Sequence, residues 1–344
     1  MIDILMQYGL FLAKAVTIVA AVGVVIILAV SLSRRARPME RLEVKSLNQK
    51  YETMAQTLKR GVLSKKEYRK EAKLEKARRK AEVKEKKAGQ ARAKTRTFVI
   101  HFRGDIKATA VSSLREEITT VLTLATPEDE VLVCLENAGG LVHEHGLAAS
   151  QLLRIRQKKI PLTVAVDKVA ASGGYLMACA ANRIIAAPFA VVGSIGVLAQ
   201  LPNFHRLLDK HGIDFEQIKA GEFKRTVTVF GKNTDKERAK LKEEVEDTHL
   251  LFKNFVSENR PDLDMAHVAT GEHWYGTRAQ ELKLIDDLMT SDDYLLEASR
   301  SAELYEVTYT ARKTVGERLV SAMQSALDNV VLLLSRHPQH GRAT

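Results

Sequence analysis

The chain has 344 residues, of which 45% are hydrophobic, and a formal net charge of +11 at pH 7. Two cysteines are too few for a small disulfide-stabilised scaffold, and the apolar content is sufficient for a full hydrophobic core. The basic excess lies in the first hundred residues, so it carries no information about the partners of the remaining chain.

An apolar run occupies residues 10–32 and carries a single charge, Lys14. At about 1.5 Å per residue, a helix over this run would cross a hydrocarbon core of roughly 30 Å. A cleaved signal peptide is the weaker interpretation, because no basic residue precedes the run and three arginines follow it at once. We therefore expect residues 1–33 to be an N-terminal membrane anchor.

Residues 34–96 contain 23 Lys and Arg against 8 Glu. The stretch 65–94 is rich in Glu, Lys, Ala and Arg without a wide apolar stripe, which predicts an exposed charged helix. We interpret residues 34–96 as a basic linker that is attracted to anionic membrane lipid. Nucleic-acid binding is not expected, because this helical stretch has one aromatic side chain, Tyr68, and no recognisable nucleic-acid-binding module.

From residue 97 onward, short apolar runs alternate with segments of helical spacing, which is typical of right-handed βαβ units on a parallel sheet. We expect one α/β domain over 97–300, followed by a C-terminal extension, 301–344. The apolar stretch 319–334 of this extension is expected to form an oligomer-contact or interfacial helix. The expected strands are 98–102, 131–135, 162–166 and 183–187, and the expected helices are 112–125, 143–156, 173–181 and 234–259, with a packing helix and turn over 276–288.

Ser172 lies in the sequence Lys-Val-Ala-Ala-Ser-Gly-Gly-Tyr. It follows the strand at 162–166 and opens a helix of small residues, so its hydroxyl is expected where the first-turn amides of that helix converge. These amides have no partners within the helix and carry partial positive charge, which suits an oxyanion forming beside an attacking oxygen. This is the position of a serine nucleophile, although many Ser-Gly-Gly turns are only tight connections.

Three further segments have the chemistry to complete such a site. Gly139 and Gly140 follow the strand at 131–135 and can expose their amides at positive φ. A glycine-punctuated apolar run, 191–197, contains Ser194, and residues 218–224 are expected to form a short strand that ends in a lysine. Loops that follow the strands lie at the sheet edge where parallel α/β proteins bind ligands.

The order of these motifs, from the Gly-Gly loop through Ala-Ser-Gly-Gly-Tyr and Gly-Ser-Ile-Gly-Val to Lys-Ala-Gly-Glu-Phe-Lys, resembles the signal peptide peptidase A family of membrane serine peptidases. The resemblance is closest to the single-repeat, SohB-like branch and covers about residues 98–288. It implies a Clp protease/crotonase-like α/β fold and a membrane-anchored endopeptidase that cleaves peptide bonds through a Ser/Lys dyad and an acyl-enzyme, without metal or cofactor. It also implies a homo-oligomer, because relatives form rings in which neighbouring subunits complete the substrate groove.

Carried over residue by residue, the resemblance makes Ser172 the nucleophile and Lys224 the general base. Ser194 would hydrogen-bond the lysine amine and orient it. The oxyanion donors would be the amide of Gly173 and that of either Gly139 or Gly140, and the sequence does not choose between these two glycines.

A lysine that acts as the base has to be neutral to accept the proton of a serine hydroxyl. The ordinary lysine pKa of about 10.4 must then fall to about 7, which corresponds to roughly 4–5 kcal/mol and requires burial away from water and carboxylates. Phe223 and Val227 could exclude water from the amine, whereas Glu222 has to face away from it.

The family usually has Ser-Pro before the paired glycines, and this chain has Asn137-Ala138 in those places. Loss of the proline frees φ at that position, which could loosen the oxyanion loop or the strand that receives the substrate. Because the donors are backbone groups, the change leaves the chemistry possible and its efficiency open.

The resemblance places the chain in the inner (plasma) membrane of a bacterium, as a single-pass protein anchored by residues 10–32. Basic residues follow the apolar run, while only Asp3 precedes it, so the positive-inside rule predicts a cytoplasmic catalytic domain. Relatives are usually described with this domain across the membrane, and the periplasmic side therefore stays open.

Other functions fit the sequence less well. His143 and His145 are two residues apart, not the three or four that place zinc ligands on one helix face, and no histidine lies in the glycine loops to form a Ser-His-Asp triad. Cys134 and Cys179 have apolar neighbours typical of core residues. Two alternatives stay open: a catalytically silent membrane scaffold of the same fold, and a crotonase-type acyl-CoA enzyme, for which no CoA-binding feature is visible.

Overall fold

The computed structural model describes residues 41–87 and 95–310, together with Gly9, Leu12, Lys14, Val16 and Thr17. Residues 42–308 form one compact unit. The remainder of the predicted anchor, 10–32, lies outside the described residues, as does the predicted C-terminal helix, 319–334. Within the described part of the chain, no helix has both the length and the apolar character needed to span a membrane.

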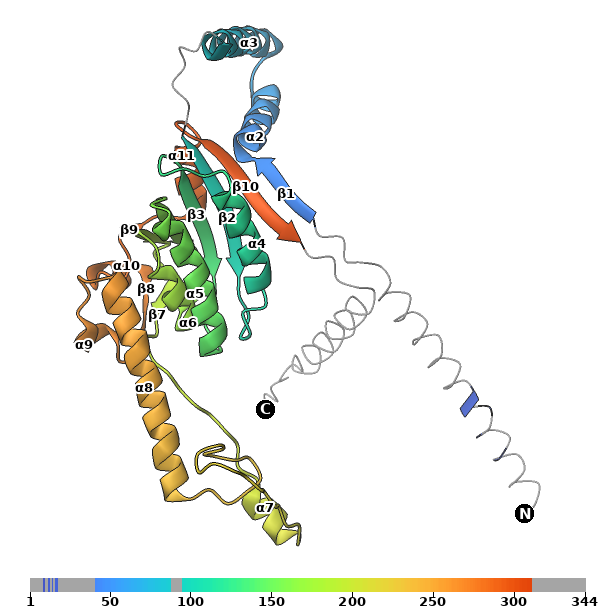
Figure 1. Ribbon diagram of the computed structural model, residues 1–344. Coiled ribbons are helices and arrows are strands. Elements are labelled where there is room, and N and C mark those ends of the chain that lie inside the picture. Colours follow the sequence, from blue (N-terminus) through green and yellow to red (C-terminus); the bar gives the residue numbers. More distant parts are fainter. Residues whose placement is uncertain are drawn as a thin grey trace, which may run out of the picture. The chain divides into compact units, whose positions relative to one another are not determined.

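A seven-stranded sheet forms the centre of the unit (Figure 1). Every strand pair from β10 to β9 is parallel, as the alternation of apolar runs and helices predicts. The four strands expected from the sequence are confirmed and lie at its middle. In spatial order the strands are β1 (Arg41–Ser46), β10 (Glu303–Thr310), β2 (Arg96–Arg103), β3 (Glu130–Glu136), β4 (Leu162–Val166), β6 (Arg183–Ala186) and β9 (Asp287–Leu288).

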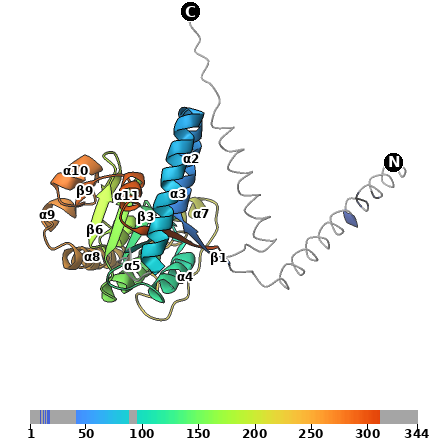
Figure 2. The same cartoon turned by 90° about the horizontal axis from the view of Figure 1, so that it is seen from above.

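Helices cover both faces of this sheet (Figure 2). Alternate residues of each strand point to opposite faces, so the sheet has two apolar cores. The larger core packs beneath α4 (Val111–Leu122), α5 (Val142–Gln157) and α6 (Gly173–Ala178). The smaller one lies under α11 (Ser291–Ala298) and the start of α2 (Leu47–Val62). Helices α4, α5 and α6 lie close to the expected ranges 112–125, 143–156 and 173–181, which confirms the α/β architecture.

The N-terminal part of the segment expected to be a linker belongs to the domain. Asn48 of α2 donates side-chain hydrogen bonds to the carbonyl oxygens of Ser299 and Ala302 and accepts one from the amide of Leu304, at 2.7–3.1 Å. Strand β1 precedes it at the sheet edge, next to β10. The sheet therefore extends on both sides of the expected 97–300 domain. The exposed charged helix expected further on is α3 (Lys65–Lys87).

A small second sheet carries the candidate site. It contains β5 (Val169–Ala171), β7 (Val191–Gly193) and β8 (His273–Tyr275), with β5 and β7 parallel and β7 and β8 antiparallel. Around it lie the short helices α9 (Met265–Val268) and α10 (Gly276–Glu281). Because β5 ends one residue before Ser172, the position of this serine is set by the small sheet.

A long helix leads away from this site. Helix α8 (Asp235–Asn259) is capped by Thr234, whose hydroxyl accepts a hydrogen bond from the amide of Glu237 while the Glu237 carboxylate accepts one from the amide of Thr234. Residues 198–234, which we call the arm, precede it and contain α7 (His205–Lys210). Figure 1 shows the arm at the N-terminal end of α8, away from the large sheet.

An ion pair at the start of β2 and β3 gives the fold a defined acid sensitivity. Arg96 Nη2 lies 2.6 Å from Asp129 Oδ2, and the amide of Thr126 donates to the same carboxylate oxygen at 2.8 Å. Burial raises the pKa of Asp129, but the hydrogen bonds from Arg96 and Thr126 outweigh it and lower the pKa from 3.8 to about 2. The contribution to stability is therefore full above about pH 4 and is lost as the pH falls towards 2.

Asp129→Asn is expected to lower the free energy of unfolding at pH 7 by about 2 kcal/mol, because the charged partner of Arg96 is removed. The variant should also lose less stability than the wild type between pH 4 and pH 2. Urea unfolding at both ends of this range measures the effect, with the exposed Asp262→Asn as the control. An unchanged acid dependence in Asp129→Asn would show that the ion pair does not contribute.

Candidate active site

Ser172 stands on a strained turn between β5 and α6. Its backbone has φ 53° and ψ −120°, a combination that serine rarely adopts. Hydrogen bonds hold the turn on both sides, from the Ser172 amide to the oxygen of Gly193 at 2.8 Å and from the amide of Leu176 to the oxygen of Ser172 at 2.9 Å. All six residues of α6 are buried, so the core fixes the helix that this serine opens.

Ser194 lies beside Ser172. The parallel register of β5 and β7 pairs Ala171 with Gly193, so the next residue on each strand is a serine. Ser194 also has a positive φ, 54°, and its amide donates to the oxygen of Glu272 at 2.6 Å. Two adjacent strands are thus each followed by a serine with a positive φ.

The Gly-Gly loop after β3 approaches Ser172 closely. A Cβ atom built on Gly139 would lie 2.7 Å from the Cβ of Ser172 and 2.9 Å from the amide nitrogen of Gly173, so only glycine fits there. The Gly139 amide donates to the side-chain oxygen of Asn137 at 2.7 Å and is therefore occupied. The amides of Gly140 and Gly173, in contrast, donate to no protein group in the described part of the chain.

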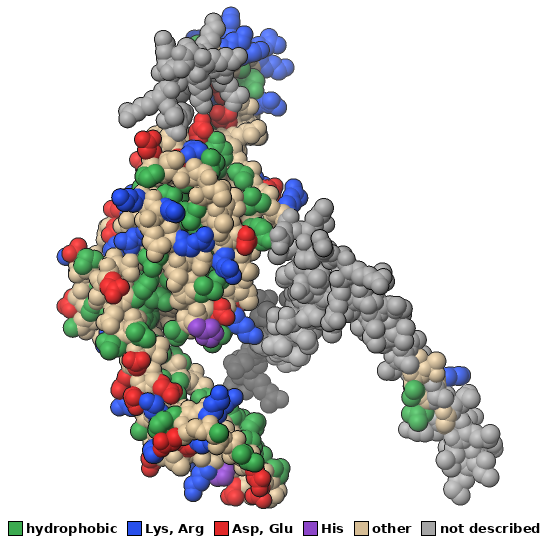
Figure 3. Space-filling model, viewed as in Figure 1, with side chains coloured by type: hydrophobic (Ala, Val, Ile, Leu, Met, Phe, Trp, Pro, Cys, Tyr) green, Lys and Arg blue, Asp and Glu red, His purple; other side chains and the backbone are tan. Residues whose placement is uncertain are grey.

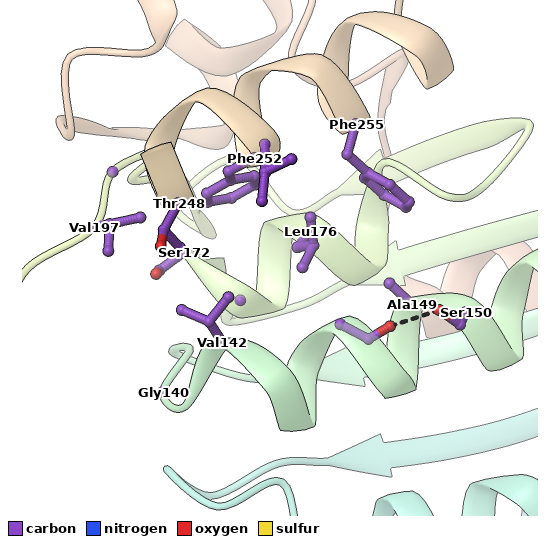
Figure 4. Close-up of a pocket in the computed structure, with 14 residues that line it drawn as sticks. Gly140, Val142, Ala149, Ser150, Ser172, Leu176, Val197, Thr248, Phe252 and Phe255 are labelled. Atoms are coloured by element: carbon purple, nitrogen blue, oxygen red, sulfur yellow. Dashed lines mark hydrogen bonds between the residues drawn. The ribbon is translucent and has the colours of Figure 1, made fainter. Parts of the chain in front are cut away.

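A cavity of about 320 Å³ opens at this point. Ser172, Gly140 and Gly173 line one end of it, and the rest is mainly apolar. In Figure 4 the side chain of Ser172 lies between α8, which contributes Thr248 and Phe252, and α5. The apolar side chains that line the cavity are Val142, Ala149, Leu176, Val197, Leu251, Phe252 and Phe255.

Lys224 is not at this cavity. It is exposed on the arm, and residues 218–224 form turns and irregular structure, so the predicted strand is wrong there. Gly221 has φ 91°, and the amide of Lys224 donates back to its oxygen at 3.2 Å, which closes a turn where no partner strand is available. The turn directs Glu222 to an ion pair with Lys236 of α8.

Ion pairs fix the arm at the far end of α8. Lys219 lies 2.8 Å from Glu237, in the first turn of the helix, and donates to the oxygen of Arg225 as well. The first residue of α8 that lines the cavity is Thr248, which is twelve positions beyond Lys236 in the sequence. At 1.5 Å per residue this is about 18 Å along the helix. Ser172 and Lys224 of one chain are therefore not brought together.

The arm exposes several large apolar side chains. The ring of Phe230 lies next to those of Phe204 and Phe215, with ring centroids 6.2 and 5.9 Å apart, and all three side chains stay exposed. Ile218 is 98% exposed and Phe223 is 43% exposed. Apolar side chains also appear on this part of the surface in Figure 3. An exposed apolar patch of this kind marks a contact surface.

The other residues considered from the sequence are in structural positions. Burial raises the pKa of both Cys134 and Cys179 to about 12, which makes these thiols unreactive, and both cysteines are free. His145 is fully buried in α5, and His143 is exposed. No group of three or more potential metal ligands occurs among the residues that the structure describes.

Sequence reasoning missed the α8 side of the cavity and the role of Asn137. The spacing of Thr248, Phe252 and Phe255 is that of any helix face that packs on a core, so no sequence signal distinguishes a cavity wall from a core contact. Asn137 was noted only as a departure from Ser-Pro, yet its side chain is 1% exposed and binds the glycine loop.

Comparisons with known proteins identify the family of the chain. The sequence matches the models for Peptidase family S49 N-terminal, over residues 3–152, and Peptidase family S49, over residues 154–305. "Probable protease SohB" from Haemophilus influenzae is 45% identical over 337 residues, 96% of each chain. "Probable protease SohB" from Buchnera aphidicola subsp. Acyrthosiphon pisum is 51% identical over 239 residues, 70% of this chain and 71% of that one.

A solved mutant of the 1510-N membrane-bound stomatin-specific protease has a TM-score of 0.40 and 14% identity, covering 60% of this chain and 86% of the other, which is too weak to define the fold. The assignment to a family rests on the 45% identity to the Haemophilus protein over nearly the full length of both chains, and on the two consecutive family models. The chain belongs to peptidase family S49, a protease family, and within it to the SohB-like branch of the signal peptide peptidase A family.

Proposed function

We propose that the chain is a serine endopeptidase in which Ser172 forms an acyl-enzyme with the peptide substrate. The observation that carries this proposal is the position of Ser172. A strained turn holds it at one end of an apolar cavity, beside two backbone amides that have no protein partner among the described residues. A strained backbone at a cavity is a common property of catalytic residues, because the surrounding structure has to maintain it.

The oxyanion donors in this proposal are Gly140 and Gly173. The Gly139 amide is occupied by Asn137 Oδ1 and does not line the cavity, whereas Gly140 and Gly173 line it together with Ser172. Gly173 is the first residue of α6, where helix amides lack intrahelical partners. Two amides of this kind are the usual means of stabilising the negative oxygen of a tetrahedral intermediate.

The general base in this proposal is Lys224 of a neighbouring copy. Within one chain, the ion pairs of Lys219 and Glu222 hold the turn that carries Lys224 at the first turn of α8, and about 18 Å of helix separates this turn from the cavity. The exposed apolar residues around it, including Ile218 and Phe223, would become buried against a second copy. That contact would also remove water from the amine, as a neutral lysine base requires. A homo-oligomer is therefore part of the catalytic proposal.

Ser194 is the orienting residue. It leaves β7 in register with Ser172, so an amine that reaches one serine is within range of the other. Its hydroxyl can accept a hydrogen bond from a lysine amine and so direct the nitrogen lone pair towards the Ser172 hydroxyl.

In the reaction, Ser172 Oγ attacks the peptide carbonyl carbon while its proton passes to the neutral Lys224 amine. The amides of Gly140 and Gly173 hold the oxyanion. The lysine ammonium then donates the proton to the departing amine, the C–N bond breaks, and an ester remains on Ser172. A water molecule gives a proton to the lysine amine and attacks this ester, which releases the carboxyl product and restores the serine hydroxyl.

The lining of the cavity favours an apolar substrate side chain. Its apolar walls, from Val142 on α5 to Phe252 and Phe255 on α8, suit an apolar side chain of an extended or membrane-derived peptide. The predicted anchor, 10–32, and the basic segment, 34–96, would hold the enzyme at an anionic inner-membrane surface, with the catalytic domain on the cytoplasmic side by the charge rule.

A fluorophosphonate probe and a fluorogenic peptide with apolar residues test the proposal. Wild type is expected to react with the probe and cleave the peptide, and Ser172→Ala is expected to lose both by at least about 10⁴-fold while it remains folded. Ser112→Ala, an exposed serine of α4, is the matched control and should be fully active. A folded wild type that neither reacts nor cleaves would favour a silent scaffold, and tight CoA binding would favour an acyl-CoA enzyme.

A further inference from the structure

Asn137 and His145 form a buried polar pair directly beneath the glycine loop. Asn137 is 1% exposed and His145 is fully buried. Asn137 Oδ1 accepts the amide hydrogen of Gly139 at 2.7 Å, and His145 Nε2 lies 3.2 Å from the same oxygen. The other ring nitrogen, Nδ1, lies 2.9 Å from the oxygen of Leu141. Each ring nitrogen faces an acceptor. If Nδ1 carries the proton, it donates to the oxygen of Leu141, and if Nε2 carries it, it donates to Asn137 Oδ1.

The amide of Asn137 can be oriented in only one way. With its oxygen towards Gly139, it accepts a hydrogen bond, and its NH₂ group lies 3.8 Å from the sulfur of Met177, a weak acceptor. The opposite orientation would place the NH₂ group against the N–H of Gly139, and two donors would face each other. The carbonyl oxygen of this side chain is therefore committed to the glycine loop.

The pair also touches the second side of the candidate oxyanion site. A Cβ atom on Gly173 would lie 2.4 Å from Cγ of His145, so the imidazole ring packs directly against the first residue of α6. The backbone of Asn137 links β3 to β5, because its amide donates to Val169 at 2.9 Å and its oxygen accepts from Ala171 at 3.0 Å. Asn137 and His145 thus contact both segments that supply the oxyanion amides.

We propose that Asn137 and His145 are positioning residues that hold the amides of Gly140 and Gly173 in register for the reaction; this inference rests on the proposed function. Where the family usually has a proline that restricts φ before the paired glycines, this chain has a hydrogen bond from the Gly139 amide to Asn137 Oδ1, which closes the turn. Ala138 N–H donates to no protein group in the described part of the chain, so the loop has no other tie at that position. The departure from Ser-Pro is then a substitution of one constraint for another, not a loss.

Asn137→Ala tests this role. Removing the hydrogen bond frees the Gly139 amide and allows the Gly140 amide to move, and a displacement of about 1 Å at a catalytic group costs on the order of 100-fold in rate. We expect kcat, corrected for the amount of probe-reactive enzyme, to fall by about 100-fold with KM nearly unchanged. A residue with only a structural role would lower the yield of folded protein and leave the corrected kcat unaltered.

Rescue provides the sharper test. The double variant Asn137→Ser with Ala138→Pro installs the usual family pair. It is expected to recover kcat to within about tenfold of wild type, because the proline ring restricts φ in a loop that has lost the hydrogen bond to Asn137. His145→Phe keeps the ring against Gly173 but loses both polar contacts, and we expect a kcat loss of about tenfold. His143→Ala, on the exposed face of the same helix, is the matched control and should match wild type.

Amide hydrogen exchange resolved at residue 139 tests the clamp, by which we mean the hydrogen bond from Gly139 to Asn137, and does not depend on an activity assay. In wild type the Gly139 amide should exchange slowly and the Gly140 amide rapidly, and Asn137→Ala should abolish the difference. An unreactive wild type would defeat the proposed function, while exchange at Gly139 would still decide whether the clamp exists. Equal exchange at both glycines in wild type, or an unaltered corrected kcat in Asn137→Ala, would overturn the inference.

Discussion

Two inactive variants, Ser172→Ala and Lys224→Ala, are expected to regain peptidase activity when they are co-expressed and assemble together. Each variant alone should lose at least about 10⁴-fold in kcat, because one member of the dyad is missing from every site. In a mixed assembly, about one quarter of the contacts join an intact Ser172 of one copy to an intact Lys224 of another. The cleavage of a fluorogenic peptide per mole of protein measures this recovery.

The reason for this expectation is the geometry of a single chain. Lys219 and Glu222 hold the arm at the first turn of α8, and about 18 Å of helix separates this turn from the cavity. Lys232→Ala, an exposed lysine on the same arm, is the matched control and should remain active alone. If the mixture stays as inactive as its components although both chains are present in one oligomer, the dyad does not form between copies.

Gly140→Ala is expected to lower kcat by about 10²–10³-fold with little change in KM. A Cβ atom at this position would lie 2.1 Å from the backbone oxygen of Ile106, and that oxygen already accepts the amide of Leu141 at 2.9 Å. The loop has to move to relieve the clash, and the Gly140 amide then leaves the position where the oxyanion forms. Loss of one oxyanion donor has an effect of this size in other enzymes.

Steady-state kinetics, combined with thermal unfolding, separates this effect from general damage. Gly61→Ala is the control, because a Cβ atom on Gly61 in α2 meets nothing within 4 Å. It should increase stability slightly through helix propensity and leave kcat unchanged. A Gly140→Ala enzyme with normal kcat would mean that this amide does not bind the oxyanion, and Gly139 would then have to be reconsidered as the donor.

The centre of the fold could be predicted because its sequence signals are local. Strands β2, β3, β4 and β6 are buried on both faces and therefore appear as continuous apolar runs. Helix α8 carries a complete capping box at Thr234, which defines its first residue. The turn at Ser172 and the small residues of α6 are likewise contiguous in sequence, so the position of the serine could be predicted together with the helix that follows it.

The edges of the domain could not be predicted in this way. Strands β1 and β10 are only partly buried, and their alternating polar and apolar residues lie in stretches dominated by charge. Strand β10 joins the sheet by pairing with β2, and β1 lies beside β10. Helix α2, which follows β1, is held there by contacts between residues 251–256 positions apart, from Asn48 to Ser299, Ala302 and Leu304. Such a contact has no sequence period, so the structure alone assigns residues 41–62 and 301–310 to the domain.

Two features of the candidate site depend on contacts that a single sequence does not encode locally. Lys224 lies in a turn because no strand is available to pair with it, and in the proposed reaction its place in the site depends on a second copy. Asn137 and His145 are eight residues apart, and their meeting requires that α5 turn back beneath the loop that precedes it. The motif order identified the loops, but the choice between Gly139 and Gly140 required the hydrogen bond from Gly139 to Asn137.

The most direct test of the account is to identify the residue that carries the covalent adduct after the full-length protein reacts with a fluorophosphonate. Peptide mass spectrometry should find the adduct on Ser172, in the peptide that follows Lys168, and reaction should be faster with the intact oligomer than with dissociated chains. An adduct on a different serine, or a folded oligomer that forms none, would contradict the assignment of Ser172 as the nucleophile.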